Sequence, residues 1–164
     1  MLFRSIDGNH DLGRSFEVTQ HAQHTLFAAL ADQDVDLRGI VLKPSMVISG
    51  AGAADRAGIR EVAQETLRCL LSTVPAAVPG IAFLSGGQSD EEATQHLNAM
   101  NEIGGSLPWA VTFSYGRALQ AAAMKRWAGH SDNVESARQV AFHRAQMNGA
   151  AALGQYSSEM EKAA

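Results

Sequence analysis

Several residue types are scarce in this chain of 164 residues, and each scarcity excludes a class of protein. A single cysteine rules out a disulfide within the chain, and with it a small secreted domain held together by disulfides. The 13 lysines and arginines are outnumbered by 17 aspartates and glutamates, which argues against the basic surface of a nucleic-acid-binding protein. No apolar run approaches the roughly 20 residues that a membrane-spanning helix needs. We therefore expect neither nucleic acid nor membrane among the partners.

The amino terminus has little apolar character. Its first residues, MLFRSIDGNHDLGR, carry charge early and lack the apolar core of a signal peptide, so a cytoplasmic protein is expected. Hydrophobic residues make up 46% of the chain, and the length suits one domain over residues 1–164. The cysteine, Cys69, lies among apolar residues at helical spacing, which predicts a buried, unreactive thiol.

Helical and strand-like segments alternate along the chain. The apolar spacing predicts helices over residues 15–31, 54–74, 89–103, 117–127 and 132–153, and strands over residues 40–42, 81–84 and 109–113. The sequence from Ser89 to Glu92 fits a capping box, in which the glutamate reaches back to the cap. The strands are continuous apolar runs, which is typical of parallel strands covered by helices. The fold class is therefore α/β.

A polar motif follows each predicted strand. Lys43 follows the first strand, Ser85-Gly86-Gly87 the second, and Ser114-Tyr115-Gly116-Arg117 the third. In parallel α/β folds, ligands bind at the carboxyl ends of the strands. The three motifs are therefore expected to face one common site.

The second and third motifs have the composition of a phosphate site. Glycines bring backbone N–H groups close to an anion, a helix amino terminus adds partial positive charge, and an arginine matches phosphate oxygens. The candidate phosphate-binding residues are Ser85, Gly86, Gly87, Ser114, Gly116 and Arg117. Spacing alone leaves open that the glycines form ordinary turns and that the arginine is a surface cation.

Lys43 directly follows the apolar run of the first predicted strand. An amine in an apolar pocket loses proton affinity, and a neutral amine can attack a carbonyl to form a Schiff base. We expect such a pocket around Lys43, with Arg117 as a nearby cation. The alternative is a strand-end lysine whose amine extends into water.

Three long motifs resemble class I fructose-bisphosphate aldolases: VLKPSMV, GIAFLSGGQSDEEA and PWAVTFSYGRALQAAAMKRWAG. The segments DGNHDL and RAQMNGAAALGQYS resemble the same family, so the similarity covers nearly the whole chain. The resemblance implies a TIM (β/α)8 barrel, of which this chain covers the sixth, seventh and eighth strands with their helices.

The resemblance also implies an activity. The lysine of the LKP motif, here Lys43, would form a Schiff base with dihydroxyacetone phosphate or with the hexose bisphosphate. The six residues of the SGG and SYGR motifs given above would bind a substrate phosphate. The implied reaction is the reversible aldol cleavage of fructose 1,6-bisphosphate in glycolysis and gluconeogenesis. Class I members need no metal or other cofactor, and His21 and His24 have no further ligands beside them.

The chain also departs from the family. A complete barrel needs about 250 residues, and the catalytic glutamate pair would fall within Met1 to Phe3, where no residue is acidic. Ser45 stands where the family usually has asparagine. Two alternatives to a complete catalyst stay open: a non-catalytic sugar-phosphate-binding or assembly module, and a half-barrel that dimerises. We expect an exposed sheet edge that pairs with another copy or with the missing half of the barrel.

Overall fold

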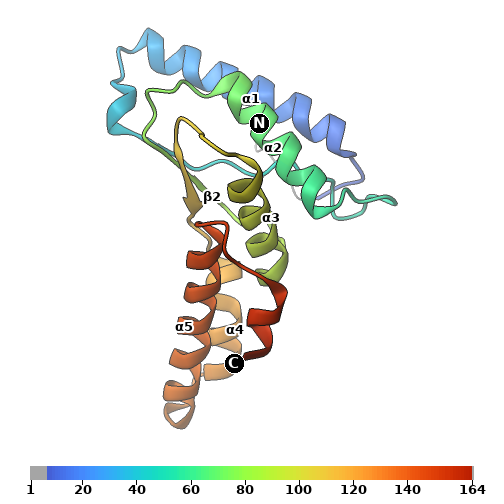
Figure 1. Ribbon diagram of the computed structural model, residues 1–164, viewed down its shortest axis with the longest axis vertical. Helices are drawn as coiled ribbons and strands as arrows, with labels where there is room; N and C mark the ends of the chain where they lie inside the picture. Colours follow the sequence, from blue (N-terminus) through green and yellow to red (C-terminus); the bar gives the residue numbers. More distant parts are fainter. Residues whose placement is uncertain (1–6, 164) are drawn as a thin grey trace.

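The computed structural model describes residues 7–163, which form helices and short parallel strands in alternation (Figure 1). The helices are α1 (Leu12–Asp32), α2 (Ile59–Thr73), α3 (Asp90–Ile103), α4 (Arg117–Trp127) and α5 (Val134–Ala151). The strands are β1 (Val41–Leu42), β2 (Gly80–Phe83) and β3 (Ala110–Phe113). Three 3-10 turns complete the order: η1 (Leu37–Gly39), η2 (Ser131–Asn133) and η3 (Ser158–Ala163).

The sheet has the order β1-β2-β3 with both pairs parallel, as the continuous apolar strands predicted. Ile81 of β2 pairs with Leu42 on one side and with Val111 on the other. Helices α2 and α3 make the two crossovers, which parallel neighbours require.

Among residues 7–163, helices cover one face of the sheet and no layer covers the other. Ile81 and Phe83 are fully buried in a cluster with apolar side chains of α2, α3 and α5. On the opposite face Val41 is 63% exposed, and the face also carries Ala82, Ala110 and Thr112. We call this second surface the open face.

The helices pack in a row. α1 lies against α2, α2 against α3, α3 against α5, and α5 against α4 (Figure 1). Where α1 meets α2, Phe16 and Cys69 are buried together, and the guanidinium of Arg68 lies 3.8 Å from the centre of the Phe16 ring. Cys69 is 1% exposed, and its burial raises the thiol pKa to about 11. The predicted burial of this thiol is confirmed.

The element boundaries differ from the sequence prediction mainly before α2. That helix begins at Ile59 rather than at Ala54. The N–H of Ala57 donates to the hydroxyl of Ser49 at 3.1 Å, which holds the chain in a loop until Gly58 caps the helix. The last helix begins at Val134 rather than at Asp132, because the 3-10 turn η2 precedes it. Helix α4 has the predicted bounds.

The cap predicted for the third helix is half confirmed. The N–H of Glu92 donates to the Ser89 hydroxyl at 3.1 Å. The carboxylate of Glu92 accepts a hydrogen bond of 2.9 Å from Arg56 instead of reaching back to the cap. A tertiary ion pair has therefore replaced the local contact that the capping box predicts.

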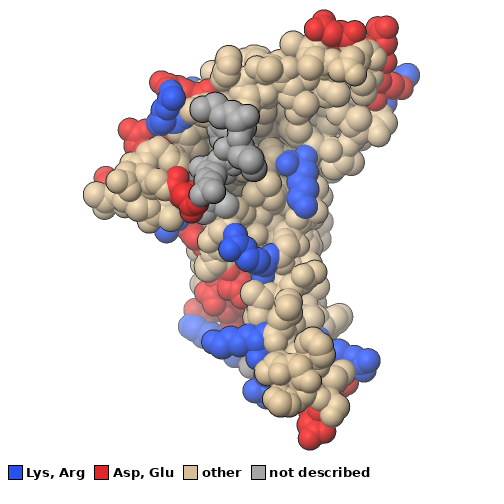
Figure 2. Space-filling view, turned by 180° about the vertical axis from the view of Figure 1, so that it is seen from behind, with Lys and Arg blue, Asp and Glu red and all other residues tan. Residues whose placement is uncertain are grey.

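Within residues 7–163 no helix is long and apolar enough to cross a bilayer, and no three ligand-type side chains are grouped as a metal site needs. His21 and His24 are both exposed on α1. Positive and negative side chains are interspersed over the face of the molecule that Figure 2 shows.

Candidate functional site

The carboxyl ends of the three strands lie side by side. Backbone hydrogen bonds continue past the strands themselves: the N–H of Leu84 donates to the carbonyl of Pro44 at 3.1 Å. On the other side of β2, the N–H of Ser114 donates to the carbonyl of Phe83 at 2.8 Å. The three motifs predicted to form one site therefore follow adjacent strands at the same end of the sheet, the end where the strands have their carboxyl termini.

The SGG motif forms a tight turn after β2. The N–H of Gln88 donates to the carbonyl of Ser85 at 3.0 Å and closes it. Gly86 has φ +55° and Gly87 has φ +80°, the left-handed region that residues with a side chain rarely adopt. The turn leads directly into α3, so the positive end of that helix lies beside it. The first turn of α3 also carries the carboxylates of Asp90, Glu91 and Glu92, which offset the charge of the helix end, so the backbone N–H groups of the turn are the candidates for binding an anion.

A small cavity of about 70 Å³ opens beside the SGG turn. It lies between the turn and the loop that follows β1, and it is lined by Ile48, Ser49, Ala51, Arg56, Gly86, Gly87, Gln88 and Glu92. The cation of Arg56 is held by the carboxylate of Glu92 at 2.9 Å. Because this ion pair is partly exposed, it adds little to stability, but it places a guanidinium next to the glycine turn.

The SYGR motif connects β3 to α4. Gly116 caps that helix with no side-chain hydrogen bond, and Arg117 is its first residue. A Cβ atom added to Gly116 would meet no atom within 4 Å, and φ is −92°, so this fold does not itself require glycine there. Arg117 is exposed, with no ion pair or side-chain hydrogen bond to any described residue.

Tyr115 has a structural role that the sequence interpretation did not assign. Its ring is 5% exposed, and its hydroxyl donates to the carbonyl of Ala93 at 2.8 Å. Burial raises the pKa of this phenol, so the hydroxyl stays protonated as a donor. The contact joins the SYGR loop to the first turn of α3.

Lys43 directly follows β1, at the same carboxyl-terminal end of the sheet as the other two motifs. Side chains alternate along a strand, so Lys43 shares the open face with Val41, and both are exposed. The expectation that an apolar pocket surrounds the amine is therefore wrong for residues 7–163. The physical reason is that this face of the sheet has no covering layer among residues 7–163, and the amine has no hydrogen bond or ion pair there.

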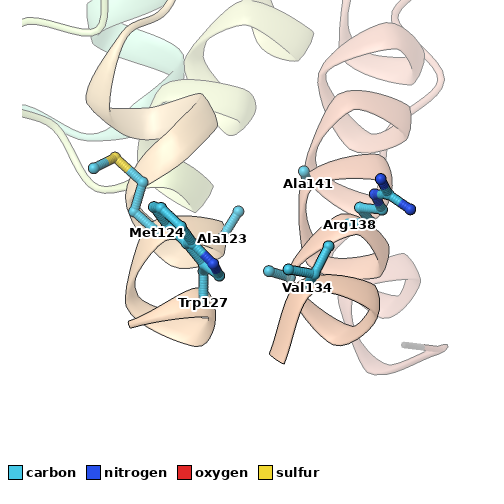
Figure 3. Close-up of a pocket in the computed structure, with 7 residues that line it drawn as sticks. Ala123, Met124, Trp127, Val134, Arg138 and Ala141 are labelled. Carbon is cyan, nitrogen blue, oxygen red and sulfur yellow. The ribbon is translucent and has the colours of Figure 1, made fainter. Parts of the chain in front are cut away.

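A separate hollow lies between α4 and α5. This apolar groove of about 420 Å³ separates Met124 and Trp127 on α4 from Val134 and Ala141 on α5 (Figure 3). Arg138 lies at its edge. The groove contains none of the predicted site residues, since Arg117 begins α4 and the groove lies toward the other end of that helix.

The sequence analysis assigned no role to three residues near the predicted site: Arg56, Gln88 and Tyr115. Arg56 was assigned to the interior of a helix that begins after it. Gln88 follows the glycines directly, but its side-chain partners lie on α3 and after β1. The place predicted for the catalytic glutamate pair, Met1 to Phe3, lies outside the described residues.

Comparison with known proteins decides the family. A family model described as "Fructose-bisphosphate aldolase class-I" matches residues 5–164. The chain belongs to the class I fructose-bisphosphate aldolases. It is 51% identical over 152 residues to a protein of Xanthomonas campestris pv. campestris named "Probable fructose-bisphosphate aldolase class 1". It is 44% identical over 156 residues to "Fructose-bisphosphate aldolase 4, cytosolic" of Arabidopsis thaliana.

The fold comparison agrees with the family. The chain superposes with a TM-score of 0.90 and 45% identity on the aldolase of Plasmodium falciparum, solved in complex with TRAP and a small-molecule inhibitor. The predicted partial aldolase barrel, with three parallel strands and their helices, is thus confirmed.

The chain spans less than half the length of these aldolases. The matches cover 92% of this chain but 45% of the Xanthomonas protein, and 95% of this chain but 40% of the Arabidopsis protein. For the Plasmodium structure the shares are 93% and 44%. Among residues 7–163 no strand pairs with the outer edge of β1, and this edge and the open face are surfaces that a longer barrel would cover.

Proposed function

We propose that this chain carries the Schiff-base lysine and the phosphate site of a fructose-bisphosphate aldolase, with Lys43 as the nucleophile. The observation that supports this most directly is the meeting of three strand ends, each with its family motif, at one edge of the sheet. The amine would attack the ketone of a sugar phosphate, and the resulting imine would accept electrons as the adjacent carbon–carbon bond breaks. Imine formation would expel water, and loss of the proton from the neighbouring hydroxyl would release glyceraldehyde 3-phosphate as the carbon–carbon bond breaks. Protonation of the remaining enamine and hydrolysis of the imine by water would then release dihydroxyacetone phosphate and the free amine, with no metal in the electron-sink role.

The phosphate of the substrate would be bound by the SGG turn and by the start of α4. The residues concerned are Ser85, Gly86, Gly87, Ser114, Gly116 and Arg117. The positive φ angles of the turn support this role, and so does the exposed Arg117 side chain, which has no partner among residues 7–163. A phosphate fixed at this edge would hold the ketone within reach of the amine, so that binding energy contributes to orientation.

We further propose that turnover requires more of the barrel than the described residues provide. Met1 to Phe3 offer no carboxylate, and loss of general acid–base catalysis typically costs about 10²–10⁴-fold in rate. Pairing with another copy, or with the remaining strands of a barrel, would cover the open face and give Lys43 apolar walls. We propose the cytoplasm as the location: the Arabidopsis relative is named cytosolic, whereas the Oryza sativa relative, at 49% identity, is named chloroplastic.

The test is covalent trapping. The protein is incubated with dihydroxyacetone phosphate and sodium borohydride, which reduces an imine to a stable secondary amine. We expect mass spectrometry to find the adduct on Lys43, and we expect Lys43→Ala to lose it. Lys125→Ala, at the exposed end of α4, is the matched control and should label as the unchanged protein does. A folded protein with no adduct at Lys43 would exclude the Schiff-base role.

A non-catalytic sugar-phosphate-binding module is the second candidate. The exposure of Lys43 favours it, because no apolar wall among residues 7–163 surrounds the amine. The trapping experiment separates the two functions if the binding of the phosphate ester is measured together with the adduct. Phosphate-ester binding without any adduct would support the module, whereas binding together with an adduct on Lys43 would support the enzyme.

A further inference from the structure

The side chain of Gln88 makes two contacts that hold the SGG turn from both sides. Its amide oxygen lies 2.5 Å from Nδ1 of His96 on α3. Its amide nitrogen donates to the sulfur of Met46 at 3.5 Å, in the segment that follows Lys43. Its backbone N–H closes the turn on Ser85 at 3.0 Å. One residue therefore connects the phosphate turn, the helix behind it and the chain just after the lysine.

The partners of Gln88 are deeply buried. Met46 and His96 are each 1% exposed. An amide oxygen only accepts hydrogen bonds, so the Nδ1 of His96 carries the proton and its Nε2 is left with a lone pair. That Nε2 is buried and has no hydrogen-bond partner among the described residues. Burial lowers the pKa of His96 to about 4, so the ring is neutral near pH 7.

An apolar residue in place of His96 would avoid the cost of the unpaired Nε2. The hydrogen bond between Nδ1 of His96 and Gln88 therefore explains a histidine at this position better than the packing of α3 does. The glycines beside Gln88 make such support necessary: two residues with positive φ and no side chain have wide conformational freedom when unrestrained. Backbone N–H groups bind an anion well only if their directions are fixed in advance.

We infer that Gln88 is a positioning residue, held by His96, that fixes the Ser85–Gly87 turn relative to the segment after Lys43. This inference rests on the proposed phosphate site at that turn. According to this inference Gln88 contacts no reacting atom. It affects phosphate binding by fixing the backbone of Gly86 and Gly87.

The first experiment uses inorganic phosphate as the probe and follows the amide signals of Gly86 and Gly87 by NMR. The variants are Gln88→Met, which keeps the length of the side chain but removes its polar atoms, His96→Leu, and the double variant. We expect each single variant to weaken phosphate binding roughly tenfold, the equivalent of one neutral hydrogen bond. The double variant should be no weaker than either single one, because the two residues act as one unit.

Gln95→Met is the matched control. Gln95 precedes His96 on α3 but lines a different hollow, beside Tyr156, so phosphate affinity should not change. The second experiment compares borohydride trapping of dihydroxyacetone phosphate with trapping of dihydroxyacetone. Gln88→Met should slow only the phosphorylated ketone, because only this ketone uses the turn. A general loss of structure would slow both equally.

The outcomes separate the inference from the proposed function. If unchanged protein binds phosphate and Gln88→Met binds it equally well, the inference is wrong and the phosphate site stands. Additive losses in the double variant, or equal slowing of both ketones, would also overturn it. If the unchanged protein binds no phosphate at these amides, the proposed phosphate site and the inference both fall.

Discussion

The hydroxyl of Tyr115 donates to the carbonyl oxygen of Ala93 at 2.8 Å, which ties the loop after β3 to the first turn of α3. The loop after β3 is therefore bonded to α3, the helix that directly follows the SGG turn, so the contact connects the two motifs that we propose bind phosphate. Phe113 packs against the same tyrosine ring, with 5.5 Å between the ring centres. A local contact of this kind makes one site out of two loops.

Removal of that hydroxyl should loosen the connection. We expect Tyr115→Phe to lower the free energy of unfolding by about 1 kcal/mol, the usual net value of one hydrogen bond. Urea unfolding followed by circular dichroism would measure the change. An unfolding midpoint equal to that of the unchanged protein would show that the contact does not stabilise the fold.

Arg117 should contribute directly to the binding of phosphate esters. We expect Arg117→Ala to weaken binding of dihydroxyacetone phosphate by at most about 3 kcal/mol, the range of a charge-assisted hydrogen bond. Arg126→Ala, in the last turn of the same helix, is the matched control and should leave the affinity unchanged. Isothermal titration measures both, and equal affinities in the two variants would remove Arg117 from the site.

His96 should make stability depend on pH in a defined window. Its folded-state pKa is depressed from 6.5 to about 4 by burial, while Glu92 opposes the shift and Arg56 adds to it. The unfolded state therefore binds a proton that the folded state rejects, and stability falls as pH drops from about 6.5 toward 4. The full loss would be about 3 kcal/mol. Thermal unfolding across this window should show the slope, and His96→Leu should flatten it; an equal slope in both proteins would contradict the assignment.

The packing of the carboxyl-terminal turn η3 against α5 should depend on Glu161. Its carboxylate accepts hydrogen bonds from Arg144 at 2.5 Å, from His143 at 3.0 Å and from Tyr156 at 3.0 Å. Burial alone would raise the pKa of Glu161, but these three donors outweigh it and lower the value.

Arg144 is 4% exposed, so loss of its partner would leave a buried charge unpaired. We expect Glu161→Gln to cost about 3 kcal/mol of stability, and Glu159→Gln, whose exposed partner is Lys162, to cost almost nothing. Because the pKa of Glu161 is depressed, its contribution is complete above pH 4.5 and is lost as pH falls through the folded-state value. Equal urea midpoints for the two variants at pH 7 would contradict the buried ion pair.

Gly50 should tolerate no side chain. A Cβ atom there would lie 2.2 Å from the backbone oxygen of Gly8, in the DGNHDL segment that packs on this loop. We expect Gly50→Ala to destabilise the protein by about 3 kcal/mol through this overlap. Gly39→Ala, where a Cβ atom meets nothing within 4 Å, is the control and should have little effect in the same unfolding experiment.

The sequence predicted the elements well where local signals were strong. The apolar runs bounded by glycine became β2 and β3, and Arg117 to Trp127 became α4 without correction. The start of α2 was wrong because alanines favour a helix from Ala54 onward, while the fold bonds Ala57 to Ser49 and keeps that stretch in a loop. Helix propensity is a small energy, and one tertiary hydrogen bond is enough to override it.

The sequence by itself determined the family, the order of strands and helices, and the motif at the end of each strand, because these follow from residue types and their spacing along the chain. Only the tertiary structure decided what surrounds those motifs. The contacts of Gln88 with Met46 and His96, of Tyr115 with Ala93, and of Arg56 with Glu92 join residues from different elements. The exposure of Lys43 likewise depends on which surfaces cover the sheet, and no local pattern in the chain encodes them.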